Sequence, residues 1–218
     1  MQIQPALNTT AYHHLKNMIL SGELEFYKLY SETQTAAMLN VSRTPVRDAL
    51  VRLTQEHYID VFPSKGFMLH KPNAEDLRNA RHFRLAIEGY CAAVLAAQSQ
   101  DAGQPVIARM EEILQQQASV ADKAHGKAFW HLDTVFHTEL VSWIQNDYFD
   151  GLYTNCNYLF TSLPVSNFFE EERHKSTLLE HAEILHALKS GDSGRARDAV
   201  IHHIEESTRA ILKNVDMP

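Results

Sequence analysis

The stretch NVSRTPVRDALVRL, residues 40–53, decides the fold of the first third of the chain. Pro45 suits the first turn of a helix. The apolar residues that follow recur on one helical face: Val46, Ala49, Leu50 and Leu53. A shorter helical segment precedes this one, with Ser31 as its N-cap and Leu39 near its end. Asn40 favours the left-handed turn between them, so the sequence predicts a helix-turn-helix.

The flanking segments extend this motif. Residues 9–21 have the pattern of a further helix, and residues 59–70 have the pattern of a strand, a tight turn at PSKG and a second strand. Three helices followed by a hairpin make a winged helix-turn-helix. We therefore expect a DNA-binding domain over residues 1–72, with Pro72 and Asn73 at its boundary.

The rest of the chain has no convincing strand pattern. Helical patterns cover six segments: 73–99, 104–122, 125–145, 147–161, 169–190 and 193–214. The predicted fold class is mainly α, with the winged helix-turn-helix followed by an all-α antiparallel bundle over residues 73–218. Bundles of this kind build their sites from inward side chains on facing helices.

The charge of the chain is divided unevenly between these two parts. The formal net charge is −7, yet residues 1–72 hold seven Lys and Arg against six Asp and Glu, a net of +1. The remainder holds thirteen against twenty-one, a net of −8. A chain this acidic as a whole is not typical of a nucleic-acid binder, so DNA binding is expected of the first part alone.

Targeting signals and cysteine frameworks are not evident in the sequence. The first twenty residues lack a basic start followed by a long apolar run, and the apolar stretch CAAVLAA is too short to span a bilayer. Cys91 and Cys156 are too few for a disulfide framework and are expected to be buried thiols. These features favour a cytoplasmic protein with no membrane association.

The start of the predicted recognition helix carries the candidate DNA contacts. The N-terminal residues of the second helix of a helix-turn-helix face the major groove. Ser42, Arg43, Thr44 and Arg47 fall there, and arginine can bind guanine through two hydrogen bonds. Lys65 and Gly66, at the tip of the wing, are expected near the adjacent DNA backbone or minor groove. The alternative, a capped helix with solvated basic residues, is weakened by the helix and the hairpin on either side.

The stretch SETQTAAMLNVSRTPVRDALVRLTQEHYIDVFPSKGF, residues 31–67, resembles the DNA-binding domain of GntR-family bacterial transcription regulators. The helical remainder resembles the ligand-sensing, FCD-type domain of the FadR-like branch. The resemblance implies a homodimer on a short palindromic operator, with Arg43 and Arg47 contacting the DNA. It also implies that a small-molecule effector controls DNA binding, most often by relieving repression.

Several positions depart from the family pattern. The family usually has Pro-Gly where this chain has Phe26 and Tyr27, and Gly at Asn40 and His57. It usually has Leu at Thr35, and an Arg that helps to hold DNA where this chain has Thr33. These departures leave the fold prediction unchanged and bear on the affinity for DNA and on the operator sequence.

A candidate metal site begins at DTVFH, residues 133–137. Asp133 and His137 are four residues apart and leave one face of a helix together. His181 and His203 lie on either side of the SGDSG break, where two antiparallel helices would bring them side by side. Three imidazoles and one carboxylate suit a borderline divalent ion, zinc first, with nickel and manganese as alternatives. The same quartet matches the metal ligands of FadR-like sensor domains.

An effector pocket is expected in the same bundle. Arg84 and Glu88 lie one helical turn apart, and the family often has these two residue types there, so the resemblance implies that Arg84 faces a carboxylate ligand. A plain ion pair along the helix is the alternative. The remaining candidate wall residues are Tyr90, Asn146, Tyr153 and Asn157.

Two other interpretations of the metal site remain open. A metalloenzyme with an attached DNA-binding domain would also use three histidines and an open coordination position. No hydrolase motif such as H-E-x-x-H accompanies these histidines, however, so we expect no enzyme activity. A DNA-binding protein with a purely structural metal is the second alternative.

Overall fold

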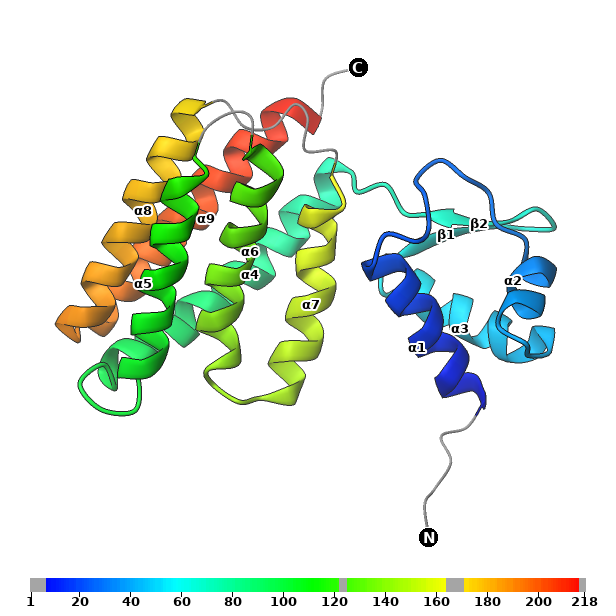
Figure 1. Ribbon diagram of the computed structural model, residues 1–218, viewed down its shortest axis with the longest axis horizontal. Coiled ribbons are helices and arrows are strands. Elements are labelled where there is room, and N and C mark those ends of the chain that lie inside the picture. Colours follow the sequence, from blue (N-terminus) through cyan, green and yellow to red (C-terminus); the bar gives the residue numbers. More distant parts are fainter. Residues whose placement is uncertain (1–6, 122–124, 164–170, 216–218) are drawn as a thin grey trace, which may run out of the picture. The chain divides into compact units, whose positions relative to one another are not determined.

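The computed structural model describes residues 7–121, 125–163 and 171–215, and its helices and strands follow the predicted order (Figure 1). The elements are α1 Leu7–Leu20, α2 Glu32–Met38, α3 Arg43–Gln55, β1 Ile59–Phe62, β2 Gly66–Leu69, α4 Ala74–Ala97, α5 Gln104–Ser119, α6 Gly126–Ser142, α7 Asp147–Thr161, α8 Glu171–Ser190 and α9 Ser193–Val215. The predicted start of the eighth helix at residue 169 lies outside the described residues. The chain divides into two compact units, Met1–Pro72 and Asn73–Pro218.

The first unit is a winged helix-turn-helix, which confirms the predicted fold class. Helix α3 packs closely on α1 and also contacts α2 and β1. The strands β1 and β2 pair antiparallel, with Ile59 opposite Leu69 and Phe62 opposite Gly66. The core of this unit uses the apolar stripe of the recognition helix, since Val46 and Leu53 are fully buried.

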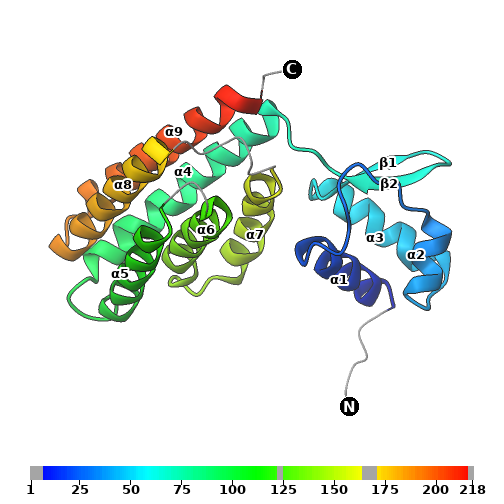
Figure 2. The same ribbon diagram turned by 45° about the horizontal axis from the view of Figure 1, so that its top comes forward.

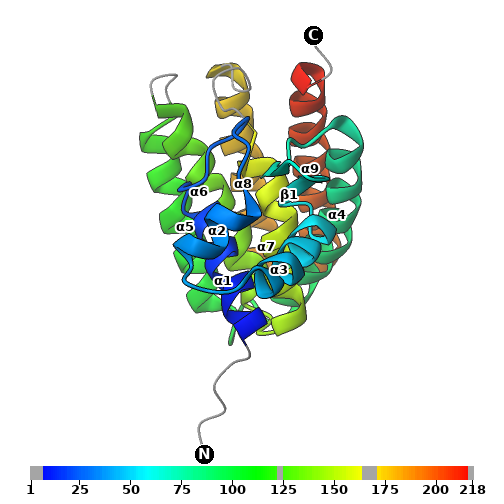
Figure 3. The same cartoon turned by 90° about the vertical axis from the view of Figure 1, so that its right-hand side faces the viewer.

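The second unit is a bundle of long helices. Its first helix, α4, starts with a capping box in which the Asn73 side chain accepts hydrogen bonds from the backbone of Glu75 and Asp76. Helix α4 makes its most extensive contacts with α9, and the two lie side by side in Figure 2. Helices α8 and α9 also pack together, joined by a turn in which Gly191 has a φ of 75°. The helices of this unit run roughly along a common direction in Figure 3.

The bundle buries polar groups as well as an apolar core. Phe136, Leu140 and Ile184 belong to the main apolar cluster and are fully buried. A group of charged and polar side chains is equally buried, and it includes Arg84, Glu88, Gln117, Asp133, His137, His181 and His203. Charged groups are rarely buried without partners, so this group is the place to look for function.

Candidate metal centre and nucleic-acid interface

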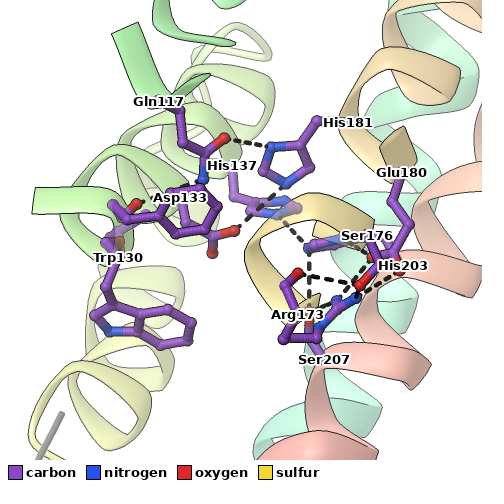
Figure 4. Close-up of polar contacts among 12 residues, drawn as sticks. Gln117, Trp130, Asp133, His137, Arg173, Ser176, Glu180, His181, His203 and Ser207 are labelled. Carbon is purple, nitrogen blue, oxygen red and sulfur yellow. Dashed lines mark hydrogen bonds and ion pairs between the residues drawn. The ribbon is translucent and has the colours of Figure 1, made fainter. Parts of the chain in front are cut away.

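The four predicted metal ligands come together inside the bundle. Asp133 and His137 lie one turn apart on α6, His181 lies on α8, and His203 lies on α9 (Figure 4). One potential ligand atom from each lies within 4.8 Å of the other three. All four side chains are buried, so the sequence spacing identified a real cluster.

The inward-facing atoms have the separations expected of ligands to one ion. His137 Nε2 lies 2.9 Å from His203 Nε2, and His181 Nε2 lies 3.4 Å from an Asp133 carboxylate oxygen. Ligands about 2.0–2.1 Å from a tetrahedral zinc ion would be about 3.3 Å apart. His181 Nε2 has no hydrogen-bond partner within the described part of the chain. A buried nitrogen of this kind fits a metal ligand.

The other ring nitrogen of each histidine faces an oxygen atom. The contacts are His137 Nδ1 to Glu88 Oε2 at 2.7 Å, His181 Nδ1 to Gln117 Oε1 at 2.9 Å, and His203 Nδ1 to Glu180 Oε2 at 2.8 Å. An acceptor at Nδ1 favours the tautomer with its proton there, which leaves the lone pair on Nε2. Histidine ligands of metals are oriented in this way, so the residues present fit a divalent ion.

Two arginines form ion pairs with the two glutamates that contact the histidines. Arg84 Nε donates to Glu88 at 2.5 Å, and the Tyr153 hydroxyl donates to the same carboxylate at 3.0 Å. Arg173 donates through both terminal nitrogens to Glu180, at 2.6 and 2.7 Å. The cluster is therefore surrounded by two Arg–Glu–His chains and one Gln–His pair. Every helix of the bundle, from α4 to α9, contributes a side chain.

The burial of these groups shifts their proton equilibria. Burial lowers the pKa of His181 well below its ordinary value and also lowers the pKa of His203. Burial alone would raise the pKa of Glu180, but hydrogen bonds from His203 and Arg173 outweigh that effect and lower it to about 2. These shifts favour neutral imidazoles at His181 and His203 beside an ionised Glu180.

The predicted effector residues are only partly gathered here. Arg84, Glu88 and Tyr153 belong to the buried network, and Arg84 and Glu88 form the ion pair that was the alternative interpretation. Asn157 is half-buried on α7, and its backbone carbonyl accepts a hydrogen bond from the Thr161 hydroxyl. Two residues have other roles: the exposed Tyr90 packs edge-on against Phe149, and the Asn146 side chain caps α7 through the backbone of Tyr148 and Phe149.

Three residues of the site were missed by the sequence reasoning. Gln117 interrupts the apolar face of α5 that contains Met110 and Ile113, and a polar residue at such a position was a usable signal. Glu180 directly precedes His181, and adjacent residues on a helix point about 100° apart, so its position in the sequence did not predict its contact with His203. Arg173 was missed because its contact with Ser207 on α9 depends on the register between α8 and α9.

In the first unit, the predicted DNA-contacting residues gather around one polar concavity. Its volume is about 380 Å³, and it is lined by Ser31, Glu32, Thr33, Arg43, Arg47, Ser64, Lys65 and Gly66. Ser42 and Thr44 are exposed beside it at the start of α3, while Pro45 and Val46 face the core. The recognition helix and the tip of the wing therefore offer a single surface.

Glu32 is an unexpected member of this surface. Its carboxylate accepts hydrogen bonds from Arg47 at 2.9 Å and from Arg43 at 3.3 Å. The Arg47 hydrogen bond, opposed by a smaller effect of burial, lowers the pKa of Glu32. The two arginines are thereby held side by side, with more than half of each side chain in solvent.

Gly66 has a packing role at the edge of this surface. It lines the concavity but is itself buried, and its φ is 131°. A Cβ atom there would lie 2.0 Å from the carbonyl oxygen of Tyr30, which is the residue that bridges to Phe67 beside β2. The glycine is needed for backbone packing, and Lys65 is the exposed residue of the wing tip.

The departures from the family pattern have a structural consequence. Tyr27, Asn40 and His57 stand where the family usually has glycine, and all three have a left-handed backbone, with φ of 65°, 52° and 58°. Asparagine tolerates this conformation, but tyrosine and histidine are strained by about 1–2 kcal/mol each. These three positions therefore keep a left-handed backbone without glycine.

Two protein-family models match this chain. Residues 7–69 match the model described as "Bacterial regulatory proteins, gntR family", and residues 80–206, more than half of the chain, match the FCD domain. The chain therefore belongs to the GntR family of bacterial transcriptional regulators, among the members that carry an FCD domain. GntR regulators bind DNA, and FCD domains bind small-molecule effectors and commonly a metal.

Relatives agree with this assignment. The HTH-type transcriptional repressor RspR of Escherichia coli is 25% identical over 181 residues, covering 83% of this chain and 78% of RspR. The Nta operon transcriptional regulator of Aminobacter aminovorans is 27% identical, covering 84% of each chain. Among solved structures, E. coli McbR/YncC has a TM-score of 0.70 at 18% identity and covers 96% of this chain and 98% of its own. Because McbR/YncC is only 18% identical, its similarity supports a shared fold and nothing further.

These comparisons decide against the metalloenzyme interpretation. The matched families and relatives are transcriptional regulators, which are not enzymes.

Among the described residues, no helix is both long and apolar enough to cross a membrane.

Proposed function

We propose that the protein is a one-component transcriptional repressor that binds a palindromic operator as a homodimer. Residues 1–72 would form the DNA-binding domain, with Ser42, Arg43, Thr44, Arg47 and Lys65 contacting the duplex. The grouping of these residues around one polar concavity supports this assignment. Residues 73–218 would bind the effector and form the dimer, in the cytoplasm. The name of RspR supports the direction of control, since that relative is a repressor.

The proposed ligands of a divalent ion are Asp133, His137, His181 and His203, with zinc first and nickel or manganese as alternatives. When bound, the ion would supply two positive charges and coordination positions for a carboxylate oxygen. Gln117, Glu88 and Glu180 would hold the imidazoles in the tautomer that presents Nε2. The three Nδ1–oxygen contacts are the observation that carries this proposal.

The effector would be a small organic acid bound beside the ion. A ligand changes DNA binding only if it prefers one state of the dimer over another. The buried network links side chains from every helix of the bundle, so a ligand that rearranges it would bias the helix packing. Arg84, Tyr153 and Asn157 remain candidate contacts, with Glu88 holding the first of them.

The test uses the full-length protein and DNA selected from a random duplex library. Fluorescence anisotropy would follow DNA binding by zinc-loaded protein during titration with a panel of carboxylic acids. We expect at least one acid to weaken DNA binding tenfold or more, and chelation of the metal to abolish that response. A zinc-loaded protein whose DNA binding responds to none of the acids would contradict the sensing role.

A purely structural metal is the second candidate. The near-complete burial of the three histidines favours it, because closed sites with four protein ligands are typical of structural zinc. Chelation would then lower the melting temperature, and no carboxylate would raise it. A carboxylate that stabilises only the metal-loaded protein would decide for the sensor.

A further inference from the structure

The polar concavity of the DNA-binding unit combines three cationic side chains with a carboxylate. Among the described residues that line it, Arg43, Arg47 and Lys65 are basic and Glu32 is the single acid. Glu32 is the first residue of α2, and the two arginines lie one helical turn apart on α3. Because α2 packs against α3, the carboxylate shares a surface with the proposed DNA contacts.

The two arginines contact this carboxylate through only part of their donor groups. Arg47 donates to Glu32 through Nε at 2.9 Å, and Arg43 donates through Nη2 at 3.3 Å. A guanidinium has five N–H donors, so both terminal groups of Arg47 and the Nε and Nη1 of Arg43 remain available. The side chains are 60% and 55% exposed, respectively. Both arginines can therefore reach a ligand without leaving Glu32.

The two kinds of DNA group that an arginine can contact differ in charge. The major-groove edge of guanine is neutral and presents two acceptors, O6 and N7. A phosphate carries a full negative charge. Glu32 is ionised at neutral pH, since the Arg47 hydrogen bond lowers its pKa. A phosphate on a guanidinium that already contacts Glu32 would meet a second negative charge nearby, whereas a guanine would not.

Building on the proposed function, we propose that Glu32 is a positioning residue that sets the specificity of DNA binding. It holds Arg43 and Arg47 side by side for base edges and disfavours their use on phosphates. A long side chain loses rotamer freedom when it binds, and an arginine already held by a carboxylate loses less of it. Glu32 thereby increases the ratio of the affinity for the operator to the affinity for other DNA.

Lys65 provides a contrast on the same surface. Its side chain is exposed at the tip of the wing, and within the described ranges it has no ion pair with a carboxylate. An ammonium group binds phosphate as a point charge and needs no fixed orientation. Lys65 would contact the backbone of any sequence, and the arginines paired with Glu32 would contact the bases.

The experiment measures the binding of full-length protein to the selected duplex and to a scrambled duplex by fluorescence anisotropy, over a series of salt concentrations. Glu32→Gln removes the charge but keeps an acceptor of the same size. We expect the affinity for scrambled DNA to rise at least tenfold and that for the selected duplex to change less than threefold. For scrambled DNA, the slope of log affinity against log salt should steepen by about 0.9 for each arginine that gains a phosphate. An unchanged ratio of the two affinities would overturn the proposal.

Two matched variants control for charge. Glu25→Gln makes the same change at an exposed carboxylate that pairs with Lys28, and it should keep the ratio within threefold of the wild type. Glu32→Asp keeps the charge and should retain most of the ratio. A loss of specificity in Glu25→Gln as large as that in Glu32→Gln would mean that any removed charge has this effect, which would also overturn the proposal.

The arginines decide whether Glu32 acts through them. When Arg43 and Arg47 are both replaced by alanine, adding Glu32→Gln should change the affinity for scrambled DNA by no more than about twofold. A tenfold rise in that background would show that the carboxylate repels DNA directly and does not position the arginines.

The outcomes separate this inference from the proposed function. If the single variants Arg43→Ala and Arg47→Ala both bind the selected duplex normally, the proposed recognition helix is itself contradicted. If these variants lose the preference for the selected duplex but Glu32→Gln keeps it, only the role of Glu32 is wrong.

Discussion

The two units use the same pair of residue types in opposite environments. In the DNA-binding unit, Glu32 pairs with Arg47 at 2.9 Å, and 60% of the Arg47 side chain is exposed. In the bundle, Glu88 pairs with Arg84 at 2.5 Å, and neither side chain is more than 5% exposed. An exposed pair can release its arginine to a phosphate or a base. A buried pair keeps its geometry and its charges fixed, as a site for a metal ion and an anionic ligand requires.

The largest expected difference is in stability. Glu88→Ala leaves Arg84 buried without its partner, and we expect the free energy of unfolding to fall by about 3–5 kcal/mol. Glu32→Ala in the exposed pair should change it by no more than about 1 kcal/mol. Urea denaturation of the two variants measures both values. Similar losses in the two variants would remove the distinction between the units.

DNA binding, unlike stability, should depend on the exposed arginines of the first unit. Arg43→Ala and Arg47→Ala should each cost about 1–3 kcal/mol of binding to the selected DNA, because each removes a possible base contact. Fluorescence anisotropy against selected and scrambled duplexes measures the loss of affinity and of specificity. Arg195→Ala, which removes an exposed arginine from the bundle, is the matched control. Normal binding by both recognition-helix variants would show that this helix does not read the operator.

Acid should weaken the bundle through its histidines. The folded state holds His181 with a pKa well below its ordinary value, so the unfolded chain takes up a proton first as the pH falls below about 6.5. The stability of the metal-free protein should therefore decrease from pH 7 toward pH 5. Glu180, with a pKa lowered to about 2, contributes stability that is lost only below its unfolded value of about 4.3. Urea denaturation across this range would contradict the account if the stability stayed constant down to pH 5.

The smallest effect concerns the strained backbone of the first unit. Tyr27→Gly replaces an exposed tyrosine at a φ of 65°, and relief of the strain should raise the free energy of unfolding by about 1 kcal/mol. Tyr148→Gly, at an exposed position in a helix, should instead lower it by about 1 kcal/mol. Thermal denaturation of the two variants gives the signs. A destabilised Tyr27 variant would mean that its ring contacts outweigh the strain.

The sequence predicted the elements well because local signals decide them. Pro45, Asn73 and the SGDSG turn mark helix ends through their own backbone and capping chemistry. The clustering of the four candidate ligands was also predictable, since a four-residue spacing and a hairpin of two helices bring them together. Glu180 was not, because its contact with His203 depends on how α8 and α9 are aligned. Arg173 was not, because its contact with Ser207 on α9 depends on the same alignment. Glu32 was missed for a similar reason: its arginine partners lie on the next helix.

The most direct test of the central claim is the metal content of purified full-length protein. Elemental analysis should find about one divalent ion per chain in the wild type and in His202→Ala, whose exposed imidazole lies next to a proposed ligand. His181→Ala and His203→Ala should hold less than about a tenth of that amount, because each loses one of four ligands. Equal metal content in all four proteins, or none in the wild type after loading with zinc, would contradict the account.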